Sequence, residues 1–195
     1  MMRRLAALAL PCVLVVAAGG CGATPTSRFY SLSAAAPSAT TSSELSVAVA
    51  PVTIPAVVDR PQIAVSAGSN EVRLDEFNRW AAPLQDNIAR VVAFNLVAML
   101  GTPNVTVGTQ TLGALADYRA AIEVQRFDSV PGEAATLDAV WTVRRTKDGK
   151  AQTGRTTVRE PASQSGFDGL AAAHSRAVAR LSRDIADTVR ALAMR

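Results

Sequence analysis

The chain has 195 residues, of which 49% are hydrophobic and 18% charged, and its formal net charge at pH 7 is +4. After residue 20 it holds 18 basic and 16 acidic residues, so this part carries a net charge of only +2. A nucleic-acid binder needs basic residues clustered on one stripe, and this balance excludes that class. The length predicts one domain with a sizeable core.

The N-terminus has the layout of a secretory signal peptide. Arg3 and Arg4 give a positive start, residues 5–18 form an almost unbroken apolar run, and small residues lead up to Cys21. This order is typical of an exported protein, and the run is short for a helix that spans a bilayer. We expect a signal peptide over residues 1–20 that is removed on export.

Cys21 gives this signal a more specific interpretation. A cysteine directly after the small residues indicates a lipoprotein, in which the thiol carries acyl chains such as palmitate and becomes the first mature residue. The alternative is an ordinary signal peptide followed by a stray cysteine. Because Cys12 leaves with the signal, Cys21 would then be an unpaired thiol in an oxidising compartment. We therefore predict lipidation at Cys21 as the sole membrane attachment.

Residues 21–43 are expected to be a lipidated tether, followed by the folded domain over residues 44–195. Eighteen of the 22 residues 22–43 are Gly, Ala, Ser, Thr or Pro, a composition too poor in apolar side chains to offset the entropy of ordering. The exception is the Phe-Tyr-Ser-Leu segment at 29–32. We expect this segment to dock on the domain as a strand edge.

Short strands and proline-bounded segments alternate at the start of the domain. Residues 45–49 alternate apolar with small or polar side chains, which predicts a half-buried strand. Residues 52–60 contain and precede prolines, so we expect them to be extended but outside a sheet. Residues 62–65 and 72–74 indicate two short strands around a turn at 68–70.

The first helix is predicted between Pro83 and Gly101. Proline suits the first turn of a helix, and glycine followed by proline ends one. Because Phe94 and Val97 lie off the apolar stripe, the helix is apolar nearly all round, and we expect it to be largely covered. The stripe itself consists of Leu84, Ile88, Val91, Val92, Leu96 and Met99.

A short strand at 105–107 precedes what we expect to be an antiparallel meander of three long strands. Alternating apolar residues mark the first two strands, over 118–124 and 139–143. Turns are predicted at 131–132 and at the Asp-Gly pair of 148–149.

The last helix is predicted to begin at a capping box, Ser165 to Asp168. Its apolar stripe consists of Leu170, His174, Val178, Leu181, Ile185, Val189 and Leu192. The whole pattern predicts an α/β fold with a single mixed, largely antiparallel sheet and two long helices packed on it.

The chain offers few residues for catalysis. His174 is the only histidine, and its place on an apolar stripe favours a packed or interfacial role over a catalytic one. No second thiol or histidine could complete a zinc site in the mature chain, and the sequence has no phosphate-binding loop or nucleophile elbow. We predict no enzyme activity, no catalytic residue, no metal site and no cofactor.

Two segments could bind a partner. Four arginines, 176, 180, 183 and 190, share one face of the last helix, which is either a solvated outer face or a contact for anionic lipid or an acidic partner. Residues 75–84 are expected to form a polar loop that carries Phe77 and Trp80. Large aromatic side chains in a loop are either lids over the core or anchors in an interface.

Three blocks of sequence follow one another in a specific order. Arg-Phe-Tyr-Ser-Leu occupies 28–32, after the predicted lipidated cysteine; a P-x-x-x-D-R-P-Q-I segment occupies 55–63; and R-W-A-x-P-L occupies 79–84. Together they resemble the ABC-type transport auxiliary lipoproteins, the PqiC-like (YmbA-like) family. The resemblance covers residues 21–100 in motif and the remainder in layout only.

The resemblance implies a periplasm-facing lipoprotein of a diderm bacterium. Members accompany MCE-domain proteins, whose rings form lipid tunnels between the two membranes, with an ABC transporter or membrane permease at the inner end. Gly22, rather than Asp, follows Cys21, which by resemblance to enterobacterial sorting places the anchor in the outer rather than the inner membrane. The implied function is a non-enzymatic docking subunit of intermembrane lipid transport.

The two loops expected at 52–61 and 75–80 are the predicted contact sites, meeting either neighbouring copies in a ring or the MCE partner. Charged and aromatic side chains there suit an interface. The residues assigned to this role are Asp59, Arg60, Phe77, Arg79 and Trp80. The alternative function is an envelope assembly factor or a periplasmic small-ligand binder, which a closed apolar pocket would favour.

Overall fold

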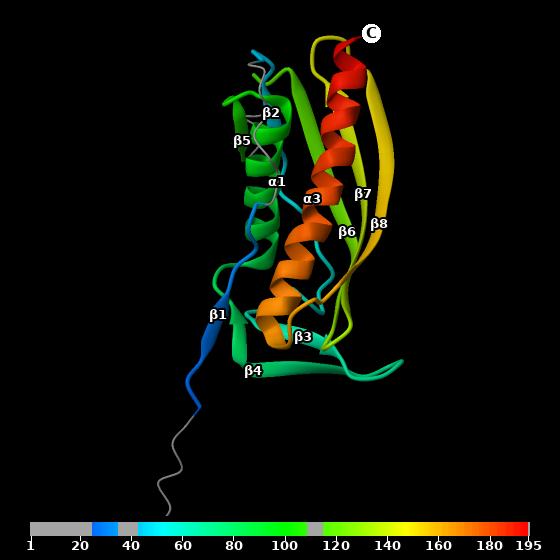
Figure 1. Ribbon diagram of the computed structural model, residues 1–195. Coiled ribbons are helices and arrows are strands. Elements are labelled where there is room, and N and C mark those ends of the chain that lie inside the picture. Colours follow the sequence, from blue (N-terminus) through cyan, green and yellow to red (C-terminus); the bar gives the residue numbers. More distant parts are fainter. Residues whose placement is uncertain (1–24, 35–42, 109–114, 195) are drawn as a thin grey trace, which may run out of the picture.

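A computed structural model describes residues 25–34, 43–108 and 115–194 (Figure 1). The predicted signal peptide, and residues 21–24 and 35–42 of the predicted tether with Cys21 among them, lie outside the described residues. Within them the elements follow in the order β1 Arg28–Tyr30, β2 Val47–Val49, β3 Gln62–Ser66, β4 Val72–Trp80, α1 Leu84–Leu100, β5 Val105–Val107, β6 Tyr118–Val130, β7 Ala134–Arg145, β8 Ala151–Pro161 and α3 Gly166–Ala193.

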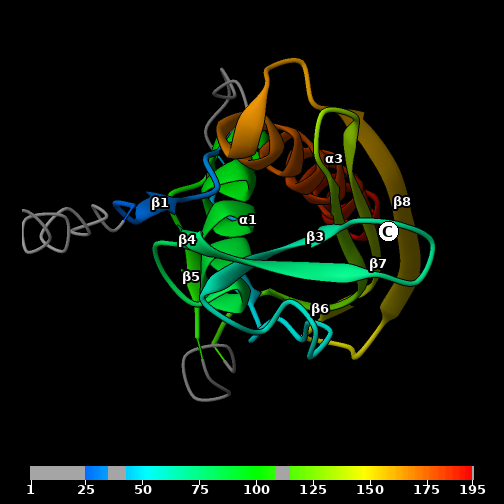
Figure 2. The same cartoon turned by 90° about the horizontal axis from the view of Figure 1, so that it is seen from below.

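The described strands form two sheets. The larger has the order β5-β2-β6-β7-β8, and the smaller has the order β1-β4-β3. Helices α1 and α3 lie side by side on one face of the larger sheet, while the β3–β4 hairpin crosses the lower end of the molecule beneath them (Figures 1 and 2). The predicted α/β class with two long helices is confirmed.

The prediction of a single sheet is wrong. After β2 the chain passes through residues 50–61, which form no strand and meet β6 at an isolated bridge between Thr53 and Glu123. Prolines cannot donate to a strand ladder, so they prevent this segment from continuing the larger sheet. The chain therefore reaches the lower end of the molecule before β3 begins, and β3 pairs there with β4.

Strand β2 is buried more completely than predicted. It pairs in parallel with both β5 and β6, which makes it an interior strand. Val47, Ala48 and Val49 are all buried, so the expected half-buried pattern is wrong. Parallel strands covered on both faces commonly lack a polar side.

Helix α1 has the predicted ends. Pro83 precedes it, and Gly101 adopts a left-handed conformation (φ 66°) from which its N–H donates to the carbonyl of Val97. The predicted stripe faces inward, and Ile88 is fully buried. The expectation that the helix is largely covered is confirmed, because 14 of its 17 residues are buried or half-buried. Its exposed residues are Asp86, Arg90 and Phe94, the last at 54%.

Helix α3 buries every residue of its predicted stripe, from Leu170 to Leu192. Ser165 is the N-cap residue with extended backbone, but its side chain makes no capping hydrogen bond. The predicted capping box therefore marks the correct start without forming the expected contact. The three-strand meander is confirmed, with β6 and β7 paired along almost their whole length.

Candidate docking surface

The segment predicted as a polar loop, residues 75–80, is the second half of strand β4. Gln62 of β3 pairs with Arg79, whereas the next residue, Ile63, pairs with Asp75. Three residues of β4 thus stand outside the ladder as a wide bulge. A bulge bends its strand and re-aims side chains, and β4 changes direction here to run upward beside β1 (Figure 1).

Asp75 holds the bulge in shape. Its Oδ1 accepts hydrogen bonds from the backbone N–H of Phe77 at 2.9 Å, from the N–H of Asn78 at 2.7 Å, and from Asn78 Nδ2 at 2.9 Å. Burial acts to raise the pKa of Asp75, but these hydrogen bonds outweigh it and hold the pKa below its ordinary value. The carboxylate therefore stays charged while it organises the bulge.

The bulge is also where the N-terminal segment joins the domain. Strand β1 pairs in parallel with β4, placing Phe29 opposite Arg79 and Tyr30 opposite Trp80. Tyr30 donates its hydroxyl to Asn78 Oδ1 at 2.9 Å. The expectation that residues 29–32 dock as a strand edge is confirmed.

Trp80 is a lid over the core. It is 6% exposed, and its ring meets Phe127 and His174 at centroid distances of 6.2 and 6.3 Å. Of the two interpretations that the sequence left open, the structure supports the core lid for this residue. Trp80 is therefore removed from the set of surface contacts.

The other four predicted contact residues are accessible and lie on adjacent segments. The N–H of Trp80 donates to the carbonyl of Pro61 at 2.7 Å, which brings the turn that carries Asp59 and Arg60 beside Arg79. Asp59 is exposed, and Arg60 and Arg79 are half-buried. Phe77, on the bulge, is 38% exposed.

The two arginines of this group are only lightly engaged within the chain. Arg60 Nη2 donates to the Ala56 carbonyl at 3.3 Å, and its buried Nε has no hydrogen-bond partner among the described residues. Arg79 Nε donates to the Glu76 carbonyl at 2.9 Å, and its Nη2 lies 3.6 Å from the Glu76 carboxylate. Such an exposed ion pair contributes little to stability, so Arg79 can exchange it for a partner contact.

The arginine face of α3 is partly structural. Arg176 donates to Glu160 at 3.1 Å, and Arg190 donates to Asp187 at 2.7 Å and to the Met99 carbonyl. Arg180 and Arg183 are exposed, and neither makes an ion pair within the described part of the chain. The interpretation as a solvated outer face accounts for Arg180 and Arg183, which are suitable control positions for charge reversal.

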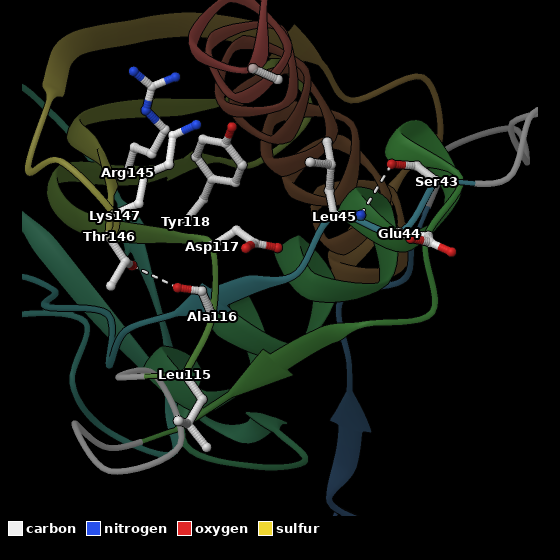
Figure 3. Close-up of a pocket in the computed structure, with 11 residues that line it drawn as sticks. Ser43, Glu44, Leu45, Leu115, Ala116, Asp117, Tyr118, Arg145, Thr146 and Lys147 are labelled. Atoms are coloured by element: carbon white, nitrogen blue, oxygen red, sulfur yellow. Dashed lines mark hydrogen bonds between the residues drawn. The ribbon is translucent and has the colours of Figure 1, made fainter.

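Beside the C-terminal end of α3, opposite the hairpin, lies an open hollow of about 660 Å³ (Figures 1 and 3). Most of its lining is polar or charged: Ser43, Glu44, Asp117, Tyr118, Arg145, Thr146 and Lys147. Apolar ligands bind in largely apolar cavities. The small-ligand alternative would be favoured by a closed apolar pocket. This hollow is open and mostly polar, so it does not support that alternative.

Two of the charged side chains at this hollow, Arg145 and Asp117, make hydrogen bonds within the chain. The buried Arg145 donates to both carboxylate oxygens of Asp148, at 3.0 and 2.6 Å, and to the Leu192 carbonyl at 2.5 Å. The hydrogen bond from Arg145 is the main cause that lowers the pKa of Asp148 to about 2. Hydrogen bonds from Ser46 likewise lower the pKa of Asp117.

His174 is packed, as predicted. It is fully buried, stacks on Phe127 at a centroid distance of 3.7 Å and shares a 2.8 Å hydrogen bond with Ser129 Oγ. Burial lowers its pKa to about 3, so the imidazole is neutral at physiological pH. No group of three potential metal ligands occurs among the described residues.

Comparison with known proteins now decides the family. Residues 30–186 match the family of ABC-type transport auxiliary lipoprotein components. The chain belongs to this family. The resemblance found in the sequence is thereby confirmed, and the family description gives the coarse function, an auxiliary lipoprotein of transport. In the described ranges, neither helix of this auxiliary lipoprotein is both long and apolar enough to cross a membrane.

Two solved structures share the fold of the auxiliary lipoprotein. The crystal structure of an uncharacterised protein has a TM-score of 0.69 at 18% identity, covering 85% of this chain and 99% of the other. A DUF330-family protein from Xanthomonas campestris has a TM-score of 0.67 at 21% identity, covering 82% and 93%. No curated protein matches the sequence. At these identities the likeness concerns the fold alone.

The structure also shows what sequence reasoning missed. Asp75 and Asn78 build the bulge. The Asp75 side chain accepts hydrogen bonds from the backbone two and three residues further on. Aspartate commonly forms such local turns, so Asp75 was a signal available in the sequence. Exposed Val72 and Leu74 were assigned to a short strand without any surface role. Their alternation beside a tight turn was the available signal.

Proposed function

We propose that this auxiliary lipoprotein is anchored in the outer membrane, faces the periplasm and docks an MCE-type lipid tunnel. Through that tunnel it would serve an ABC transporter or membrane permease. The family match supports the transport role. Non-enzymatic docking is supported by the burial of His174, since the one histidine has no access to a substrate.

The observation that carries the docking role is the grouping of Asp59, Arg60, Phe77 and Arg79. They come from two segments that the sequence alone could not place together, and the backbone bond between Trp80 and Pro61 fixes that juxtaposition. An exposed aromatic beside arginines that have few internal contacts is typical of interface centres. These residues would meet either neighbouring copies in a ring or the MCE partner.

A charge reversal tests this surface. Arg60→Glu combined with Arg79→Glu should abolish the complex recovered from crosslinked envelopes, because both cations at the surface become anions. The midpoint of thermal unfolding should stay nearly unchanged, since the Arg79–Glu76 pair is exposed. Complex recovery and circular dichroism of the purified protein are the two measurements.

The matched control reverses the same number of charges on α3. Arg180→Glu with Arg183→Glu should leave complex recovery unchanged, because both side chains point to solvent on the outer face. Normal assembly of the Arg60/Arg79 variant would exclude this surface. Loss of assembly in the α3 variant alone would move the interface to the arginine face.

A further inference from the structure

The small sheet carries three exposed apolar side chains. Phe29 is 65% exposed, Val72 is 50% exposed and Leu74 is 38% exposed. Val72 and Leu74 lie together on the outer half of the β3–β4 hairpin, whereas Phe29 of β1 pairs with Arg79 on the far side of the bulge. Exposed apolar side chains of this kind can contact another molecule or a membrane.

The pairing of β3 with β4 shows which way Val72 and Leu74 point. Ile63 is 2% exposed and Val65, two residues further on, packs against the core, so the face that they share is the inward one. Side chains alternate between the two faces of a strand, so Ala64 and Ser66, with Leu74 and Val72 opposite them, lie on the other face. Ala64 is 8% exposed, so this face is covered beside Leu74 and open at Val72. Because the hairpin lies across the lower end of the molecule, this face is the end of the molecule (Figure 1).

The lipid anchor must lie at this same end. The described chain begins at Pro25, in the segment that leads into β1 and extends downward from it, whereas the C-terminus is at the opposite end (Figure 1). Four residue steps join Cys21 to Pro25, and a fully extended chain spans roughly 14 Å over that length. The docking of β1 shortens the free tether well below the predicted 21–43. An acyl group on Cys21 therefore holds the small sheet close to the bilayer.

We propose that the outward face of the small sheet rests on the phospholipid surface of the membrane that holds the anchor. Phe29, Val72 and Leu74 would enter the interfacial region, where amphipathic segments bury apolar side chains to a shallow depth. The inference rests on acylation at Cys21, which is part of the proposed function. It adds an orientation: the two helices stand upright on the membrane, and the hollow opens away from it.

The charges on this end fit a phospholipid surface without strong anionic character. Beside Val72 and Leu74, Arg73 pairs with Glu71 at 2.7 Å. Because this pair carries no net charge, the outer half of the hairpin adds little positive charge to draw the face to anionic lipid. Contact therefore depends on apolar insertion beside the anchor, and it should change little with salt.

The orientation can be measured with a fluorescent label on the mature lipoprotein. The acylated protein is reconstituted into vesicles of phosphatidylethanolamine and phosphatidylcholine, which carry no net charge. It has no free thiol, because Cys12 leaves with the signal and Cys21 is a thioether. Leu74→Cys, carrying an environment-sensitive dye, reports on the hairpin. Leu115→Cys is the matched control, since Leu115 is 88% exposed and lines the hollow rather than the hairpin.

At position 74 we expect a blue-shifted emission in vesicles and quenching by a nitroxide on the lipid headgroup or upper acyl chain. Position 115 should show neither effect. Adding Phe29→Ser and Val72→Ser to the position-74 protein should reduce the quenching without changing its unfolding. Equal quenching at both positions, or none at position 74, would overturn the proposed orientation.

Two further outcomes separate this inference from the function on which it rests. A blue shift at position 74 that is present in detergent and insensitive to nitroxide lipid would assign the face to a second copy and overturn the membrane contact alone. Mature protein whose mass lacks the acyl chains would overturn both the anchor at Cys21 and the orientation derived from it.

Discussion

The body of the domain, which is the larger sheet with helices α1 and α3, differs in burial from the lower end, which is the small sheet. In the body, Leu137 and Ile185 are fully buried, and Asp138 receives two hydrogen bonds from Arg155, at 2.8 and 2.5 Å. At the lower end, Phe29 and Val72 are left half or more exposed. The comparison indicates that the body supplies the stability of the domain, whereas the lower end presents surface for contact.

The largest expected effect is the difference between core truncations in the two regions. Ile88→Ala and Leu181→Ala should each destabilise the domain by about 2–5 kcal/mol, because both side chains are fully buried and leave cavities. Val72→Ala should change the stability by no more than about 0.5 kcal/mol. The free energy of unfolding in urea measures all three.

A loss below about 0.5 kcal/mol at both core positions would show that the helices bury other faces than those described. A large loss at Val72 would show that the lower end is part of the core. Either result would contradict the conclusion that the body rather than the lower end supplies the stability of the domain.

His174 lies at the seam between the two regions, stacked on Phe127 of β6 and against Trp80 of β4. Its pKa is about 3 in the folded protein and about 6.5 in the unfolded chain. Below pH 6.5 the unfolded chain binds a proton that the native state excludes. The stability supplied by the neutral ring is therefore complete above pH 6.5 and falls by about 1.4 kcal/mol per pH unit towards pH 3.

His174→Phe keeps an aromatic ring in the stack and removes the titrating group. Relative to this variant, the wild type should lose stability as the pH falls from 6.5 towards 3, measured by urea unfolding at each pH. Other titrating groups act on both proteins and cancel in the difference. Parallel pH profiles would mean that the seam opens to water before His174 is protonated.

The body was largely predictable from the sequence, and the lower end was not. Pro83 and Gly101 mark the ends of α1 through local backbone preferences, and the alternation of the long strands gives the meander directly. The interior position of β2 has no local signal, because its parallel partners β5 and β6 lie far along the chain.

The small sheet depends on contacts that no short window of sequence contains. Tyr30 reaches Asn78 across 48 residues, and the bulge after Asp75 interrupts the alternation that would have identified β4 as one strand. Trp80 was left open between lid and anchor because its burial depends on Phe127 and His174 from distant elements. That the turn with Asp59 and Arg60 lies beside Arg79 could not be predicted either, because it depends on the backbone hydrogen bond between Trp80 and Pro61.

The smallest expected effects on stability are those of Gly→Ala at one position in each region. In the body, Gly154 of β8 lies opposite Trp141 of β7, and a Cβ on Gly154 would stand 2.3 Å from a ring carbon of Trp141. The ring is fixed by a 3.0 Å hydrogen bond from Nε1 to Thr156 and cannot give way easily. Gly154→Ala should therefore destabilise the domain by about 1–3 kcal/mol through overpacking.

At the lower end, Gly68 offers the matched substitution. A Cβ on Gly68 would meet nothing nearer than the Cβ of Glu71 at 4.0 Å, so Gly68→Ala should be nearly neutral, or stabilising by about 0.4–1 kcal/mol through the entropy of the unfolded chain. Urea unfolding of both variants measures the contrast. If Gly154→Ala proved neutral, the Trp141 ring would be able to move aside, and the body would not be more tightly packed than the lower end.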